Sequence, residues 1–344
     1  MKYFPVILIV LILLITPCLA EETTITLSFT GDCTLGSEEY LHKRDGSFDD
    51  YIRKYGVTYP FEKVRDIFSK DDMTIINLEG VLSDSSKGEN KKKTYRFRGP
   101  ASFVDILTSS SVELANLSNN HSGDYGKAGL QSTKDILKAA GVAYCHNQDV
   151  HIATVNGIRI AFVGLSMHEH YAIGKEINEI IASLKANGEC DFVVLNFHFG
   201  WEYSFVHNRK QFLTAHEAIG SGADLIIGTH PHVVQGIEQY KNRLILYSLG
   251  NFSFGGNTKL KPKSLQAYIA QVKLTFRDGV FYSQQLNIIP VHTTSAAPLN
   301  NFQPYLVTGE EAQAVVERIQ GDTPFQLNPY EEGVGALQDP ILAN

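Results

Sequence analysis

Short apolar runs alternate with amphipathic segments along the chain, and this alternation predicts its secondary structure. Apolar runs bounded by turn residues predict buried strands over 25–29, 73–78, 112–117, 192–197, 225–227 and 244–252. Helical spacing of apolar positions predicts helices over 60–68, 101–110, 126–140, 176–186, 209–220 and 309–319. Neither period is present in the segment 41–59 or in roughly the last two dozen residues, which are expected to be irregular.

Two turn sequences predict hairpins. Asn156-Gly157 separates strands expected at 151–155 and 159–165, and Arg277-Asp278-Gly279 separates strands expected at 267–276 and 280–289. Elsewhere strands alternate with helices, which indicates an α/β fold. We expect one domain over 25–256, with a carboxyl-terminal extension over 257–344, made of a hairpin and a helix, packed on the same domain.

Polar side chains that can bind metals follow five of the predicted strands. They are Asp32, Glu79, Asn120 with His121, His198, and His230 with His232. Ligands in open α/β sheets bind at the carboxyl ends of the strands, so these side chains are expected to converge. Loop histidines with no shared role are the structural alternative, but five such strand ends in one chain argue against it. Carboxylate, amide and imidazole donors without thiolate suit Mn²⁺, Zn²⁺ or Fe. Their number exceeds the need of one tetrahedral ion and favours two.

The amino terminus predicts export. Lys2 precedes an uninterrupted apolar run over 6–15, and Pro17-Cys18-Leu19-Ala20 resembles a cleavage site, so residues 1–20 are expected to be a signal peptide. Pro17 fits a lipoprotein motif at Cys18 poorly. The run is short for a membrane span, although an uncleaved anchor stays open. The mature chain is thus expected outside the cytoplasm, in the cell envelope or secreted.

Charge and cysteine content restrict the function further. The 344 residues carry a formal net charge of −7, which does not favour nucleic-acid binding or docking to anionic lipid. Cys33, Cys145 and Cys190 would remain after cleavage of the leader. Their spacing leaves open one disulfide with a free thiol, or three buried thiols.

Six motifs in order resemble the capsule-synthesis protein CapA family, which is tied to poly-γ-glutamate capsule formation and is similar to calcineurin-like metallophosphoesterases. The resemblance covers about 25–256. Its motifs are Thr30-Gly31-Asp32, Asn77-Leu78-Glu79, Ser118-Asn119-Asn120-His121, His198-Phe199-Gly200-Trp201-Glu202, Gly228-Thr229-His230-Pro231-His232, and Tyr247-Ser248-Leu249-Gly250-Asn251-Phe252. It implies a four-layer α/β/β/α sandwich like that of the metallophosphoesterases.

The resemblance also implies roles for individual residues. Asp32 would bind one metal ion, and Glu79 would stand where metallophosphoesterases place a bridging aspartate. Asn120 would bind the second ion, and His121 would protonate a departing oxygen. The remaining ligands would be His198, His230 and His232. The wider superfamily has a histidine where this chain has Thr34, a departure that the CapA family shares.

Four further residues are candidates for orienting ligands or contacting substrate. Glu202 would orient a metal-bound imidazole, and Asn251 follows a strand as part of the last motif. Arg96 and Arg98 would share one face of an extended segment and hold an anionic substrate, or else belong to a solvated basic loop. The segment 168–170 (His-Glu-His) is expected to be a solvated loop after a strand.

Two functions remain open at this stage. The first is an exported hydrolase of the phosphoesterase type with two divalent ions, acting on a phosphoester or on an amide of a polyglutamate-like polymer. The second is a non-catalytic envelope component that binds or exports an acidic capsule polymer. Membrane-bound capsule synthesis machinery is the expected partner in either case.

Overall fold

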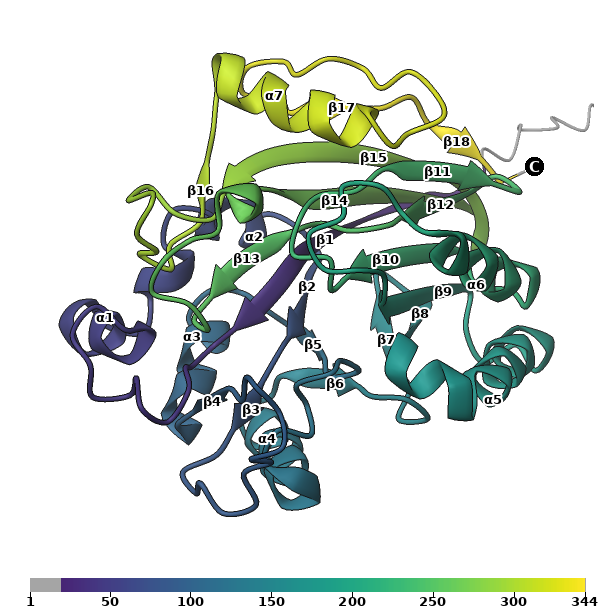
Figure 1. Cartoon of the computed structure of the whole chain (residues 1–344). Helices are drawn as coiled ribbons and strands as arrows, with labels where there is room; N and C mark the ends of the chain where they lie inside the picture. The colour runs from purple at the N-terminus through teal and green to yellow at the C-terminus, as the bar shows by residue number, and fades with distance from the viewer. Residues whose placement is uncertain (1–19, 344) are drawn as a thin grey trace, which may run out of the picture.

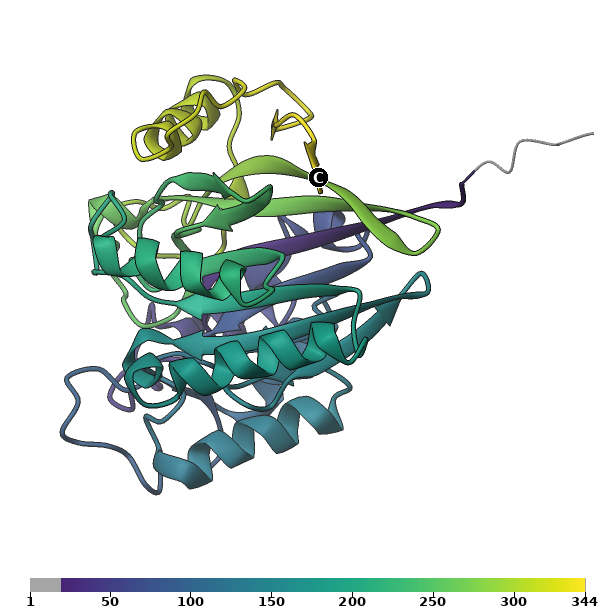
Figure 2. The ribbon, with the colours of Figure 1, turned by 90° about the vertical axis from the view of Figure 1, so that its right-hand side faces the viewer.

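The computed structural model describes residues 20–343 and shows a four-layer sandwich (Figure 1). Two β-sheets pack face to face, and helices cover their outer faces, as Figure 2 shows from the side. The expected α/β/β/α sandwich is confirmed. The predicted signal peptide lies, apart from Ala20, outside the described residues. Within the described range, no helix combines the length and apolar character needed to cross a membrane.

The first sheet holds the strands that lead to the two candidate carboxylates. Its order is β16 (Tyr305–Leu306), β15 (Val280–His292), β14 (Gln266–Arg277), β1 (Glu22–Thr34), β2 (Met73–Leu78), β5 (Leu114–Asn116) and β6 (Ala143–Cys145). β1, β2, β5 and β6 are parallel to one another, whereas β14 is antiparallel to both β1 and β15. Three short strands join at the sides: β13 (Asn251–Phe254) pairs with β1, and β17 (Ala336–Leu337) and β18 (Ile341–Leu342) pair with β15.

The second sheet holds the strands that lead to three of the candidate histidines. Its order is β11 (Ile237–Tyr240), β12 (Arg243–Leu246), β10 (Leu225–Thr229), β9 (Phe192–His198), β8 (Ile158–Ser166) and β7 (His151–Val155). The four central strands are parallel, and the edge strands β7 and β11 are antiparallel to their neighbours. A separate ribbon joins β3 (Val81–Leu82) to β4 (Arg98–Gly99).

Helices pack on the outer faces of the two sheets. The first sheet is covered by α1 (Phe48–Tyr55), η1 (Tyr59–Phe61), α2 (Arg65–Phe68), η2 (Ala101–Phe103), α3 (Val104–Thr108) and α4 (Gly126–Ala139). The second is covered by α5 (Met167–Ala186) and α6 (Arg209–Gly220). In contrast, α7 (Gly309–Gln320) packs on β15 within the same apolar cluster as the core between the sheets. The short η3 (Pro262–Ser264) precedes β14.

The core between the sheets follows from strand alternation. On β2, Ile75 faces the second sheet while its neighbour Ile76 packs among the outer helices. Phe29 on β1 and Phe162 on β8 belong to the same inner cluster as Ile75. Apolar residues on both faces explain why these strands are nearly continuous apolar runs in the sequence.

Several expectations about elements were wrong. The segment 41–59 contains α1, whose first turn is capped by the Ser47 hydroxyl accepting from the Asp50 amide. The segment 168–170 is not a loop but the first turn of α5, which Ser166 caps. The predicted helices 60–68 and 101–110 are broken into 3-10 and α segments. The carboxyl-terminal segment is largely irregular as expected, except that β17 and β18 pair with β15.

The single strand predicted over 244–252 is in fact two strands in different sheets. β12 ends at Leu246 in the second sheet, and β13 begins at Asn251 beside β1 in the first. Residues 247–250 connect the second sheet to the first. As a result Asn251 lies opposite Asp32 in the register of β1 and β13.

The carboxyl-terminal hairpin extends the first sheet. β14 runs antiparallel to β1 from Glu22 to Phe29, and β15 continues the sheet beyond it. The strand that bears Asp32 therefore has neighbours on both sides, with β2 on the other. Cys33, Cys145 and Cys190 are buried free thiols, so the question left open for them is settled without a disulfide.

Candidate metal centre

The ends of six strands converge at one edge of the sandwich. Asp32 lies near the end of β1, Glu79 directly after β2, His198 at the end of β9, and Asn251 at the start of β13. The loops after β5 and β10 supply the remaining candidates, Asn120 with His121 and His230 with His232. Both sheets therefore contribute to a single cluster.

Two glycines permit this convergence. A Cβ atom on Gly31 would lie 1.9 Å from the carbonyl oxygen of Gly250, and one on Gly228 would lie 2.1 Å from that of Tyr247. The Asp32 amide donates to the Gly250 carbonyl at 3.0 Å. The backbones of β1, β10 and the 247–250 crossover thus approach more closely than any side chain would allow.

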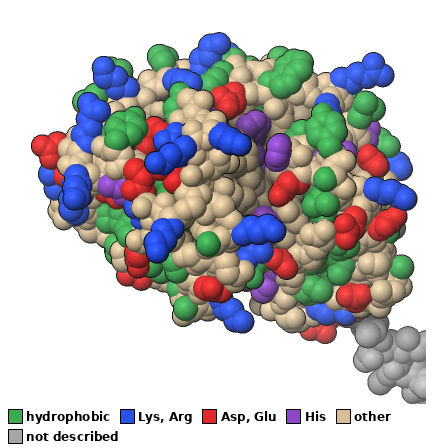
Figure 3. Space-filling view, turned by 60° about the horizontal axis from the view of Figure 1, so that its bottom comes forward, with side chains coloured by type: hydrophobic (Ala, Val, Ile, Leu, Met, Phe, Trp, Pro, Cys, Tyr) green, Lys and Arg blue, Asp and Glu red, His purple; other side chains and the backbone are tan. Residues whose placement is uncertain are grey.

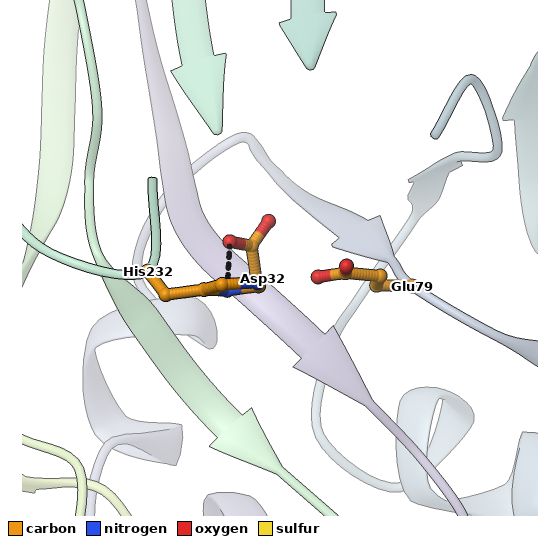
Figure 4. Close-up of side chains that lie close together, drawn as sticks. All are labelled: Asp32, Glu79 and His232. Atoms are coloured by element: carbon orange, nitrogen blue, oxygen red, sulfur yellow. Dashed lines mark ion pairs between the residues drawn. The ribbon is translucent and has the colours of Figure 1, made fainter. Parts of the chain in front are cut away.

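Asp32, Glu79 and His232 form the centre of the cluster, as Figure 4 shows. Their ligand atoms all lie within 4.8 Å of one another, and all three residues are buried. Asp32 Oδ2 lies 3.1 Å from His232 Nδ1 and accepts from the His230 amide at 3.2 Å. Asn77 Nδ2 donates to the other oxygen, Asp32 Oδ1, at 2.8 Å.

The loop that bears His230 and His232 is conformationally unusual. Their φ angles are +99° and +58°, a region that side chains other than glycine's seldom adopt. Such conformations are held in place by their surroundings and concentrate at functional sites. Here the His230 amide is bonded to Asp32, and Asn251 Oδ1 lies 2.9 Å from His232 Nδ1.

The Glu79 carboxylate is fully buried in the cluster. Within residues 20–343 neither of its oxygens has a hydrogen-bond partner. Burial, and then the neighbouring charge of Asp32, raise the pKa of Glu79 well above its ordinary value. A buried carboxylate in this state requires a proton or a cation. The surrounding oxygen and imidazole donors suit a divalent metal ion, so the residues fit the group that the resemblance implies.

The imidazoles of His198 and His230 are neutral. Burial, and then the repulsion that a proton on His230 would exert, lower the pKa of His198 well below its ordinary value. Burial, followed by the charge of His232, lowers the pKa of His230 to about 4. His198 Nε2 lies 2.8 Å from Asn120 Oδ1 and 3.9 Å from Glu79 Oε1. The buried His230 Nδ1 has no partner in the described chain. Neutral imidazole is the form that binds metals.

His232 differs from its neighbours in its protonation. Burial lowers the pKa of His232, but the negative charges of Glu79 and Asp32 outweigh burial and raise the pKa to about 9. A proton on His232 therefore balances part of the carboxylate charge in the metal-free protein. A bound cation would replace that proton.

His121 is oriented by a carboxylate that sequence reasoning missed. Its Nδ1 lies 2.7 Å from Asp124 Oδ2, and its Nε2 lies 3.8 Å from Glu79 Oε1. Asp124 also accepts from the Phe97 amide at 2.8 Å and is paired with Lys93. The acidic residue three positions after His121, in the same polar strand exit, was the signal that could have identified it.

The structure does not place every candidate in the cluster. The Arg96 guanidinium is paired with Glu89 at 3.0 Å and the Arg98 guanidinium with Glu39 at 2.5 Å, so both arginines are engaged by carboxylates of the chain itself. Glu202 is exposed, and no imidazole of the described residues is hydrogen-bonded to it. The neighbour that orients His198 is instead Thr229, whose hydroxyl lies 3.0 Å from Nδ1.

Comparisons with known proteins agree with the order of motifs. Residues 26–256 match the model of the family described as bacterial capsule synthesis protein PGA_cap. The chain is 29% identical over 279 residues to the capsule biosynthesis protein CapA of Bacillus anthracis, covering 72% of this chain and 64% of that protein. It is 27% identical to the PGA biosynthesis protein CapA of Bacillus subtilis strain 168, covering 81% of this chain and 75% of that protein.

More distant similarities have also been found. A probable polyglutamine synthesis accessory protein of Mycobacterium tuberculosis is 24% identical over 210 residues, covering 52% of this chain and 55% of that protein. The crystal structure of a hypothetical protein from Thermus thermophilus aligns with 77% of this chain and 99% of that chain, at a TM-score of 0.47 and 15% identity. The family model spans most of the chain, and the chain therefore belongs to the PGA_cap family of bacterial capsule synthesis proteins.

Proposed function

We propose that the chain is an exported, metal-dependent hydrolase of the phosphoesterase type that acts in the synthesis of a polyglutamate capsule. The observation that carries the proposal is the buried Glu79 carboxylate, which has no hydrogen-bond partner in the described residues. It lies beside Asp32 and within 4 Å of His121 and His198. Such a site is costly unless a cation occupies it.

Six residues would hold two divalent ions. They are Asp32, Glu79, Asn120, His198, His230 and His232. Divalent ions in such a site supply Lewis acidity and lower the pKa of water. The chain itself contributes a buried site in which Asn77 orients Asp32 and Thr229 orients His198.

His121 would carry the proton transfer. Its Nδ1 is held by Asp124, so Nε2 is directed towards Glu79, where it would first accept a proton from the attacking water and then donate it to a departing oxygen or nitrogen. Burial lowers the pKa of His121 despite the hydrogen bond to Asp124. The orientation of the ring is fixed before substrate arrives.

The substrate class follows from the relatives' names and from the chemistry of the ligands. A phosphoester, or an amide in a polyglutamate-like polymer, is the proposed substrate, and membrane-bound capsule synthesis machinery is the proposed partner. The alternative is a non-catalytic component that holds or exports the polymer through the same metal site.

One experiment separates the two functions. The mature chain is purified, its bound metal is measured, and turnover of phosphomonoester, phosphodiester and γ-glutamyl substrates is assayed with Mn²⁺ or Zn²⁺. We expect turnover that collapses in Asp32→Ala and His121→Ala, with metal lost only in the former. His151→Ala, on the edge strand β7, is the control. Bound metal without turnover on any substrate class would favour the polymer-binding function.

Export is tested separately. Residues 1–20 should be absent from the mature protein, and the protein should be found outside the cytoplasm. An unprocessed chain in the cytosol would reject this part of the proposal.

A further inference from the structure

The turn after α7 carries a buried carboxylate that contacts two loops of the second sheet. This residue is Asp322, whose side chain is only 4% exposed. Its Oδ2 accepts from the amides of His207 and Gly236, both at 2.9 Å. The ring nitrogen Nδ1 of His207 lies 3.0 Å from each carboxylate oxygen. Three donors therefore converge on one carboxylate, and hydrogen bonds to an ionised acceptor are the strong ones.

The same turn also meets the second sheet backbone to backbone. A Cβ atom on Gly236 would lie 1.9 Å from the carbonyl oxygen of Asp322. The Ile237 amide, at the start of β11, donates to the Thr323 hydroxyl at 3.0 Å. Glycine permits this close approach, so the turn after α7 is fixed against the segment that leads into β11.

The first contacted segment bears two of the proposed ligands. It is the loop 230–236 between β10 and β11, which we call the histidine loop, and its last amide is the one bonded to Asp322. The positive φ angles of His230 and His232 require surroundings that hold the backbone in place. His230 is partly exposed, and Figure 3 shows histidine side chains in a hollow of one face of the molecule, so solvent contacts this loop. Asp32 holds the loop at its start and Asp322 holds it at its end.

The second contacted segment is the loop 199–208, between β9 and α6. It is bonded to the histidine loop, because the Tyr203 amide donates to the Pro231 carbonyl at 2.8 Å. The His207 ring stacks on the ring of Tyr247, with centres 3.9 Å apart and planes within 2° of parallel. Tyr247 is the first residue of the crossover between the sheets. One carboxylate is thus connected to three segments that meet at the candidate metal centre.

We propose that Asp322 is a positioning residue that keeps the histidine loop in the conformation that brings His232 and the His230 amide to Asp32. It acts through the two amides and the ring that it binds, so its effect reaches the ligands along the backbone. The match to the family model ends at residue 256, so a carboxylate of the carboxyl-terminal extension supports a site whose proposed ligands all lie in the matched region. The consequence for ion binding rests on the proposed function, whereas the conformation of the loop is measurable without metal.

Asp224 offers a matched control at the opposite end of β10. Its side chain is 5% exposed, its Oδ2 accepts from the Val193 amide at 2.9 Å, and its Oδ1 is paired with Arg243 at 3.0 Å. Asp322→Ala and Asp224→Ala therefore both remove a buried carboxylate that binds an amide and a basic side chain. Asp224 is also paired with Lys185, so the control should lose at least as much global stability. It precedes β10, however, whereas the histidine loop follows β10.

The first test measures amide hydrogen exchange in the full, metal-free chain. The reporters are the amides of His230 and Gln235, which are bonded within the site, and the Leu274 amide of β14 reports global opening. Relative to Leu274, exchange of the two reporters should be about tenfold faster in Asp322→Ala and less than about twofold faster in Asp224→Ala. Asp322→Asn keeps an oxygen that can accept from the two amides and should restore most of the protection.

The second test measures the apparent dissociation constant for Mn²⁺ in the same proteins. It should rise by about 3- to 10-fold in Asp322→Ala and stay within about twofold of the wild type in Asp224→Ala. Equal relative exchange in the two alanine variants, unchanged protection in Asp322→Ala, or faster exchange with unchanged ion affinity would overturn the proposal. A wild type that binds no ion would reject the proposed function, and the exchange comparison alone would then decide the positioning role.

Discussion

The imidazoles of the metal centre are chemically unequal although they lie close together. The ring centroids of His198 and His230 are 4.6 Å apart and those of His230 and His232 are 5.9 Å apart. The pKa of His232 is raised to about 9, whereas that of His230 is lowered to about 4. Once His232 carries a proton, its positive charge lowers the pKa of the other rings. One protonated imidazole thus balances part of the charge of the two carboxylates.

This inequality predicts how the stability of the metal-free protein depends on pH. Because the folded-state pKa of His232 lies above its ordinary value of 6.5, its stabilising proton is present below pH 6.5 and is lost as the pH rises through about 9. The raised pKa of Glu79 has the same effect: the stabilising proton on Glu79 is lost as the pH rises, over a range that begins near the ordinary pKa of 4.5. The free energy of unfolding should therefore fall between pH 6.5 and 9, by up to about 1.4 kcal/mol per pH unit for each proton.

Thermal unfolding in the presence of a chelator checks this expectation. Replacement of His232 by Gln should flatten the alkaline decline, and replacement of the half-buried His151 on the edge strand β7 by Gln should not. A metal-free protein whose unfolding temperature is constant or rises from pH 6.5 to 9 would contradict the assigned protonation.

Because Asp124 holds the His121 imidazole, we expect that a substitution at Asp124 lowers the catalytic rate without lowering the metal content. Asp124→Asn keeps the shape of the side chain but weakens its hold on the imidazole, so kcat should fall by about 10- to 100-fold. Asp124 is not among the predicted ligands, so metal content should stay at the wild-type level. A shifted pH–rate profile would distinguish orientation of His121 from a general loss of structure, and an unchanged kcat would refute the role.

At the scale of elements, the strands and the polar residues that follow them could be predicted, because each of these patterns lies within a few consecutive residues. The helix predicted over 209–220 coincides with α6, and the turns at Asn156-Gly157 and Asp278-Gly279 join the expected hairpins. A buried strand that stops at a polar residue is visible without knowledge of its neighbours. The family resemblance then supplied the arrangement of the layers.

What could not be predicted depends on contacts between distant segments. The apolar run over 244–252 looks the same whether its halves lie in one sheet or two, so the crossover to β13 was invisible. The alternation of Arg96 and Arg98 shows a shared face but not the carboxylates of Glu89 and Glu39 that occupy it. The choice of Thr229 over Glu202 as the partner of His198 likewise depends on β9 and β10 pairing side by side.

Because β1 lies so close to residues 247–250, we expect that adding one methyl group at Gly31 would strongly destabilise the protein. In Gly31→Ala the new Cβ would lie 1.9 Å from the Gly250 carbonyl oxygen, so the backbones must separate. We expect a loss of about 3 kcal/mol or more in the free energy of unfolding, together with weaker metal binding, because overpacking here moves Asp32.

The matched control is Gly220→Ala in α6. Its Cβ would meet no atom within 4 Å, and alanine favours helix, so this variant should be neutral or slightly stabilised. Chemical denaturation of both variants measures the difference. Equal stabilities would show that the contact between Gly31 and Gly250 does not constrain the site.

At the scale of the whole molecule, the candidate metal centre draws its residues from both sheets. Asp32 and Glu79 come from the first sheet, and His198, His230 and His232 come from the second. Ion binding should therefore stabilise the packing of the sheets and not only one loop. Free ion at 100 times its dissociation constant would add about 2.7 kcal/mol to the free energy of unfolding.

This linkage predicts the same result for ligands from either sheet. Glu79→Gln and His198→Gln should each abolish most of the rise in unfolding temperature on adding Mn²⁺ or Zn²⁺. A full metal response in either variant would exclude that residue as a ligand.

The spread of the proposed ligands along the chain also bears on when the site can form. The His230 amide bonds to an Asp32 oxygen 198 residues earlier in the chain, and Asn251 lies opposite Asp32 in the register of β1 and β13. A nascent chain that ends before His230 lacks two of the six proposed ligands, so we expect ion uptake to come late in folding. In the export proposed above, the protein would acquire its ions from the medium in which folding finishes, and the supply of metal there would determine how much of it becomes active.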